Sequence, residues 1–147
     1  MKGVTIRNAT VGDAPAVADL AGQLGYPTTP EDAAARLGPI MADGGQAFLV
    51  AETKGVVVGW IHVHVTRLVE AAPFAELGGF VVDEAHRGQG VGRVLMAAAE
   101  DWIREEGVAK LRIRTRSDRE GAHAFYAARG FNLVKQQHIF DKPMDPP

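Results

Sequence analysis

Apolar and polar positions alternate in some stretches of this chain and recur at helical spacing in others. Strict alternation, or a short apolar run between turn residues, predicts strands at 3–10, 47–52, 56–65, 74–83, 110–115 and 131–140. Apolar residues three and four apart predict helices at 14–24, 30–41, 91–103 and 119–130. The turn "TKG" at 53–55 joins two of the strands as a hairpin.

Helix starts carry recognisable capping residues. Thr10 and Asp13 have the spacing of a capping box, and Thr29 precedes Pro30 and two acids at the start of the second helix. The predicted buried faces are Ala14, Val17, Leu20 and Leu24, then Ala34, Leu37 and Met41, then Val91, Leu95, Ala98 and Trp102.

The element order is therefore β-α-α-β-β-β-α-β-α-β. Three consecutive strands predict an antiparallel centre, and the strand–helix–strand unit from Phe74 to Thr115 predicts two parallel strands beside it. We expect an α+β fold, with a mixed, mostly antiparallel β-sheet flanked by helices. A chain of 147 residues has room for one domain over 1–147, with 141–147 as a short tail.

Composition narrows the range of functions. The net charge of -2 argues against nucleic acid or anionic membranes as partners. Without a cysteine, the chain has no disulfide, no thiolate metal ligand and no cysteine nucleophile. Because no apolar run resembles a signal peptide or a membrane span, we expect a cytoplasmic protein.

The stretch "DEAHRGQGVGRVLMAAAEDWI" (83–103) places an arginine and three alternating glycines just before a helix. Bare backbone and unpaired helix-start amides can bind phosphate oxygens, and Arg87 adds a fixed positive charge. A P-loop would need Lys-Ser/Thr after the last glycine, where Arg93-Val94 stands. A dinucleotide fingerprint would need G-x-G-x-x-G early in several βαβ units. Both patterns fit poorly, although an enzyme for another nucleotide cofactor, and a tight turn without a ligand, stay open.

The spacing Arg87-x-x-Gly90-x-Gly92 after an apolar strand resembles the Q/R-x-x-G-x-G/A signature of the GNAT superfamily of acyl-CoA-dependent N-acyltransferases. "REGAHAFYAARGF" (119–131) resembles the last common motif of that family, and the element order is similar across nearly the whole chain. "QLGYP" and "AHAFY" are similar to the branch with small-molecule and aminoglycoside-type acetyltransferases.

The resemblance implies acetyl-CoA as co-substrate, with no metal. Turn amides would bind its pyrophosphate, the preceding strand would pair with its pantetheine arm, and an N–H of that strand would polarise the thioester carbonyl. Gly78-Gly79 would form a bulge that opens a slot for the arm. The implied cofactor-binding residues are Phe80, Val81, Val82, Arg87, Gly88, Gln89, Gly90, Val91, Gly92 and Arg93.

The resemblance also implies two catalytic residues. Tyr126 matches the tyrosine that protonates the departing CoA thiolate, although its spacing also fits a core aromatic. Glu76 lies where many relatives carry a carboxylate that receives the amine proton, directly or through water. His62 and His64 are rival bases, predicted to share a strand face with Val56, Val58 and Trp60.

Relatives often carry an asparagine that bonds the pantetheine where Arg116, or Asp118 in a shifted alignment, stands here, which puts this contact in doubt.

The implied activity is direct acetyl transfer to a primary amine of a small molecule or peptide, with a homodimer as the assembly. The alternative is a CoA-binding sensor that has lost catalysis.

Overall fold

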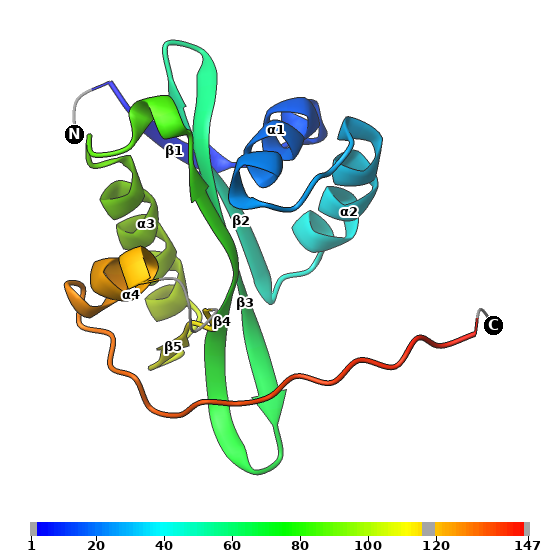
Figure 1. The fold of residues 1–147 in the computed structure, drawn as a ribbon, viewed down its shortest axis with the longest axis vertical. Helices are drawn as coiled ribbons and strands as arrows, with labels where there is room; N and C mark the ends of the chain where they lie inside the picture. The colour runs from blue at the N-terminus through cyan, green and yellow to red at the C-terminus, as the bar shows by residue number, and fades with distance from the viewer. Residues whose placement is uncertain (1–2, 116–119, 146–147) are drawn as a thin grey trace. The chain divides into compact units, whose positions relative to one another are not determined.

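The computed structural model describes residues 3–115 and 120–145 (Figure 1). The chain forms two compact units, Met1–Arg114 and Thr115–Pro147, which are described in turn.

The first unit is built on one five-stranded sheet with the order β1-β2-β3-β4-β5. Neighbouring strands are antiparallel from β1 to β4, and β5 runs parallel to β4, which confirms the predicted mixed, mostly antiparallel sheet. The strands are β1 (Thr5–Asn8), β2 (Gln46–Thr53), β3 (Val56–Leu68), β4 (Ala71–Val82) and β5 (Leu111–Arg112).

Helices cover both faces of this sheet. Helices α1 (Ala14–Leu24) and α2 (Pro30–Ala42) lie on one side and α3 (Val91–Glu105) on the other (Figure 1). Apolar residues of α1 and α2 form one buried cluster with Phe48, Trp60 and Val81 of the sheet. Ile103 and Trp102 of α3 pack with Ala75 of β4 on the opposite face. Short 3-10 turns, η1 (Val11–Asp13) and η2 (Glu84–His86), precede α1 and α3.

The second helix begins where its sequence predicts, because the Thr29 hydroxyl accepts the Asp32 backbone N–H at 3.1 Å. The predicted buried face of α3 needs a correction. Met96, Ala99 and Ile103 are buried beside Val91 and Leu95, whereas Ala98 and Trp102 are only half-buried. Residues at both sets of positions flank Leu95 on the helix surface, and packing against the sheet selects the first set. In α2 the buried residues are Ala33 and Leu37, and Ala34 and Met41 are half-buried.

The predicted faces of β3 are also partly wrong. The β2–β3 register shifts between Ala51, which pairs with Gly59, and Glu52, which pairs with Val57. Val58 is the extra residue, so the alternation reverses there and Val57 packs in the same cluster as Trp60. Val56 and Val58 therefore do not share the face of Trp60, as the alternation had predicted.

The second unit contains α4 (Glu120–Ala127), which ends in a turn where the Phe131 N–H donates to the Tyr126 carbonyl. The Tyr126 ring packs edge-on against Phe125 and Phe131, at 5.6 and 5.7 Å between ring centroids.

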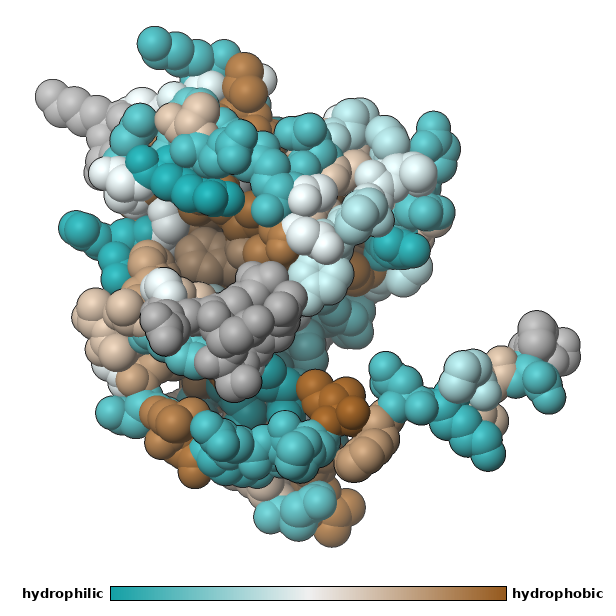
Figure 2. Space-filling view, viewed as in Figure 1, coloured by the Kyte–Doolittle hydropathy of each residue, from teal (hydrophilic) through white to brown (hydrophobic). Residues whose placement is uncertain are grey.

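The strand predicted over 131–140 is not formed in the described residues, and β5 covers two residues instead of 110–115. Alternation alone does not make a strand, because each strand needs a neighbour to bond its backbone N–H and C=O groups. Apolar side chains are exposed along this segment (Figure 2), among them Leu133 at 83% and Phe140 at 90%.

Candidate active site

The glycine turn lies between β4 and α3 and is exposed at Arg87, Gly88 and Gln89. Gly88 and Gly90 have φ angles of 78° and 88°, in the left-handed region that glycine adopts without strain. Gly90 is the N-cap of α3, and glycine has no side chain that could cap this helix. The first-turn N–H groups of α3 lack intrahelical partners and receive no bond from the N-cap residue, which is the arrangement that binds anions at helix starts.

A residue of α1 holds the start of this turn. The Gln23 amide donates to the Asp83 carboxylate at 2.9 Å, and its oxygen accepts the Glu84 backbone N–H at 2.9 Å. Asp83 also bonds the His86 ring at 2.7 Å. Hydrogen bonds from Gln23 and His86 lower the pKa of Asp83. Sequence reasoning missed this clamp, because no short motif links a helix residue to a turn 60 positions away.

The Arg87 side chain links the glycine turn to the end of β4. Its Nε donates to the Val82 carbonyl at 3.1 Å. Val82 is one of the residues predicted to bind pantetheine, and this bond occupies one of the two lone pairs of its carbonyl oxygen. This bond uses one of the five N–H donors of the guanidinium and fixes the side chain at the turn. Arg87 is therefore placed to add positive charge beside the start of α3.

The predicted bulge is present on β4. His62 pairs with Gly79 and Val63 with Leu77, so Gly78 is the extra residue. A Cβ at residue 78 would lie 2.5 Å from the His62 Nδ1, and one at residue 79 would lie 2.6 Å from the Trp60 ring. Both glycines are required because two β3 side chains occupy the space beside them.

Pairing between β4 and β5 stops just before the bulge. Within the described residues the two strands pair only at Ala75–Leu111 and Glu76–Arg112. Parallel strands that separate next to a bulge leave backbone groups of β4 facing away from β3, as the predicted slot requires. Phe80 is half-buried on this part of β4, and Val81 is buried in the α1–α2 cluster.

Glu76 lies beside His64 and Arg114. Its Oε1 accepts hydrogen bonds from Arg114 at 2.8 and 3.3 Å, and its Oε2 lies 3.9 Å from the His64 Nε2. Burial raises the pKa of Glu76, but the hydrogen bond from Arg114, its charge, the Thr66 hydroxyl and His64 together bring it below its ordinary value. Glu76 is therefore an ionised, fixed carboxylate at neutral pH.

His62 has a different environment on the same strand. Its Nε2 lies 2.7 Å from the Gln46 Oε1, and the Gln46 amide nitrogen donates to Asp43 at 2.9 Å. Burial, with a smaller effect of His64, lowers the pKa of His62 to about 4. His62 is therefore neutral at physiological pH, with its proton on Nε2 and its Nδ1 against Gly78.

The remaining predicted residues belong to the second unit or lie outside the described residues. Tyr126 belongs to the second unit, where it is half-buried on α4. Arg116, Asp118 and Arg119 lie outside the described residues. No group of three or more potential metal ligands occurs within residues 3–115 and 120–145. No helix in that part of the chain is long and apolar enough to cross a membrane.

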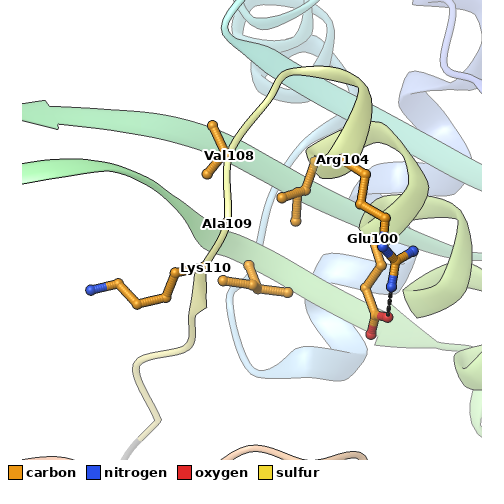
Figure 3. Close-up of a pocket in the computed structure, with 7 residues that line it drawn as sticks. Glu100, Arg104, Val108, Ala109 and Lys110 are labelled. Atoms are coloured by element: carbon orange, nitrogen blue, oxygen red, sulfur yellow. Dashed lines mark ion pairs between the residues drawn. The ribbon is translucent and has the colours of Figure 1, made fainter.

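A pocket lies at the end of α3 (Figure 3). Its lining includes Glu100 and Arg104, which form an ion pair at 3.6 Å, together with Lys110 just before β5. None of the predicted donor-binding or catalytic residues lines it. The predicted site therefore lies elsewhere, at the β4–α3 turn and the neighbouring β3–β4 surface.

A helix that begins at a bare glycine turn, a bulged β4 and a parallel β5 define the acyl-CoA N-acyltransferase class of fold. The chain matches the Acetyltransferase (GNAT) family over residues 16–131, and it belongs to that family. It is an N-acetyltransferase, in agreement with the named relatives of the family described below.

Two curated relatives and one solved structure show the extent of the similarity. Aminoglycoside N(6')-acetyltransferase type 1 of Stenotrophomonas maltophilia is 34% identical over 147 residues, which cover 97% of this chain and 95% of that protein. N-alpha-acetyltransferase RimI of Mycobacterium tuberculosis is 34% identical over 132 residues, 89% of this chain and 80% of that protein. The structure of AAC(6')-Iy in complex with the bisubstrate analogue CoA-S-monomethyl-acetylneamine shares the fold at TM-score 0.84. It is 20% identical and covers 96% of this chain and 99% of that one.

Proposed function

We propose that this protein moves an acetyl group from acetyl-CoA directly to a primary amine of a small molecule or peptide. The observation that carries the proposal is the exposed glycine turn at the uncapped start of α3, next to the bulge in β4. The open space beside Gly88, with no described heavy atom within 4 Å of a Cβ placed there, fits a bulky phosphate group. Since the chain has no cysteine, a cysteine-bound acyl intermediate is excluded, which favours direct transfer.

The donor would be bound mainly by backbone groups. The N–H groups of the turn and of the first turn of α3 would bind the pyrophosphate, with Arg87 adding positive charge. Backbone groups of β4 on the side away from β3 would bind the pantetheine arm, and an N–H of Phe80 or Val81 would stabilise charge on the thioester oxygen. Acetyl-CoA supplies the activated acetyl group.

Tyr126 would donate the proton that the departing thiolate needs, and Glu76, at the acceptor end, would take part in removing the proton from the amine. Tyr126→Phe removes only the hydroxyl, so we expect turnover to fall by about 10²–10⁴-fold with acetyl-CoA affinity nearly unchanged. Steady-state kinetics and calorimetry measure the two effects, and Phe125→Leu, next to it on α4, serves as the control for packing. Unchanged turnover in Tyr126→Phe would remove this residue from the acid role.

The acceptor class is the finer part of the proposal. The named relatives point to an aminoglycoside amine or a peptide N-terminus. A panel of kanamycin, spermidine, lysine and an alanine-initiated peptide, with release of free thiol as the readout, compares these classes. If acetyl-CoA binds but no amine releases thiol, the protein is a CoA-binding sensor instead. Tighter calorimetric binding of ATP or NAD than of CoA would contradict the proposed cofactor.

A single catalytic domain over 1–147, a cytoplasmic location and a homodimer stay predictions. Size-exclusion chromatography with light scattering tests the assembly, and cell fractionation tests the location.

A further inference from the structure

Two polar side-chain atoms face each other across β3 and β4 next to the bulge. The His64 Nε2 and the Glu76 Oε2 lie 3.9 Å apart on directly paired residues of the two strands. An ammonium nitrogen placed between them can lie about 2.9 Å from both, within the ordinary range for hydrogen bonds. The His64 side chain is 33% exposed and that of Glu76 is 15% exposed, so solvent and small solutes can reach this pair.

The neighbours of Glu76 fix which of its oxygens faces His64. Arg114 binds Oε1 through two nitrogens, and Thr66 adds a further hydrogen bond to the carboxylate. A carboxylate paired in this way is a weak proton acceptor, because protonation would break a charge-assisted bond. Its second oxygen can still hold a cation in position.

His62 is unsuited to the same task. Its Nε2–H donates to Gln46, and its Nδ1 lies against the backbone of Gly78, where a Cβ would already collide with the ring. Neither nitrogen of His62 therefore faces an incoming amine. His64, two residues further along the same face, is the histidine whose ring nitrogen faces the ionised carboxylate.

We propose that the His64 Nε2 and the Glu76 Oε2 together bind the acceptor ammonium, and that His64 accepts its proton while Glu76 stays ionised and positions both groups. This inference rests on the proposed acetyltransferase function and names the base within it. The ammonium gives one proton to the His64 Nε2, and the freed lone pair forms the N–C bond to the acetyl carbonyl carbon. The C–S bond breaks, the CoA thiolate leaves with that electron pair and takes a proton from the acid proposed above, Tyr126. A second amine proton passes to solvent to give the neutral amide.

The charges around His64 set the expected pH dependence. Glu76 faces it from β4 with a negative charge, and the positive Arg114 lies beyond β5 on the other oxygen of that carboxylate. His62, on β3 with ring centroids 5.8 Å from His64, is neutral at physiological pH. The partner of His64 on β2 is the uncharged Gln46. On the same side of β4, Lys110 and Arg112 lie over the Phe74 ring, at 4.8 and 4.5 Å from its centroid.

The test measures kcat/KM from pH 5 to 9 with acetyl-CoA and the best amine of the panel. His64→Gln should lower kcat/KM by about 10²-fold and abolish the acidic limb of the profile. In Glu76→Gln that limb should survive and move to lower pH, because the imidazolium loses its carboxylate. In Arg114→Gln it should move to higher pH. His62→Gln is the matched control, and it should keep the acidic limb in place.

The opposite outcome is equally clear. If Glu76→Gln abolishes the limb while His64→Gln keeps it, Glu76 is the base and this inference is wrong. Calorimetry with acetyl-CoA verifies that each variant still folds and binds the donor. A wild-type protein that releases no thiol with any amine would instead contradict the proposed function itself.

Discussion

The glycine turn proposed to bind the donor and the His64–Glu76 surface proposed to bind the acceptor are built from different parts of the chain. The turn uses backbone groups of one continuous segment, and its geometry depends on the left-handed conformations of Gly88 and Gly90. The His64–Glu76 surface also includes the side chains of Gln46 and Arg114, and these residues come from separate segments.

This difference explains why the two regions differ in how well a sequence describes them. A short motif is enough to describe a backbone cradle, because glycine spacing alone determines where the chain can turn. A side-chain cluster depends on strand register, which places His64 opposite both Gln46 and Glu76. The bulge at Gly78 connects the regions, since it is a backbone feature whose space is filled by a side chain.

The largest expected effect concerns this bulge. In Gly78→Ala the new Cβ would lie 2.5 Å from the His62 ring, so strand or ring must move. We expect the free energy of unfolding to fall by about 1–3 kcal/mol, the usual cost of overpacking, measured by urea denaturation. In a His62→Ala background the same substitution should cost less than about 0.5 kcal/mol, because the ring is gone.

Gly38→Ala is the matched control for that experiment. Gly38 lies in α2, and no described atom is within 4 Å of its Cβ position, so this change should leave stability equal or raise it by about 0.5–1 kcal/mol. Equal costs of Gly78→Ala with and without the His62 ring would show that the bulge does not depend on that side chain.

The next effect concerns the turn alone. Gly88→Ala meets no neighbouring atom but forces alanine to a φ near 78°, at a cost of about 1–2 kcal/mol. If the turn binds acetyl-CoA in its present conformation, the Kd should rise about tenfold, measured by calorimetry. Gly107→Ala is the control, because Gly107 has a φ of 73°, also meets no neighbouring atom and lies at the other end of α3. It should lower stability similarly and leave the Kd unchanged; equal Kd values for both variants would contradict the assignment of the turn.

The sequence predicted the mixed sheet, the starts of α1, α2 and α3, and the bulge at Gly78-Gly79. Each of these features depends on local spacing or on glycine itself. The sequence could not predict the clamp by Gln23 or the pairing of Glu76 with Arg114, since both depend on how distant segments meet. The reversed alternation at Val58 was also hidden, because a single extra residue changes the face of every residue before it.

Apolar alternation also overstated the last strand. "FNLVKQQHIF" has the pattern of a strand, but over the described residues 131–140 no strand is formed, and β5 is confined to Leu111–Arg112. Pattern reports which face of a strand would be apolar, whereas the strand itself requires a neighbour with unsatisfied backbone groups. An apolar pattern therefore overstates strand formation most where no neighbouring strand is available.

The smallest expected effect tests whether the backbone-built turn depends on a distant side chain after all. Gln23 bonds both the Asp83 carboxylate and the Glu84 N–H, so Gln23→Met removes two hydrogen bonds while keeping the length of the side chain. Each such bond contributes about 0.5–1.5 kcal/mol, and part of that loss should appear as a two- to fivefold higher Kd for acetyl-CoA. Asp19→Ala, exposed one turn earlier on α1, should leave the Kd unchanged. An unchanged Kd in Gln23→Met would mean that the glycines alone maintain the turn, and the contrast between the two regions would then be sharper than the structure indicates.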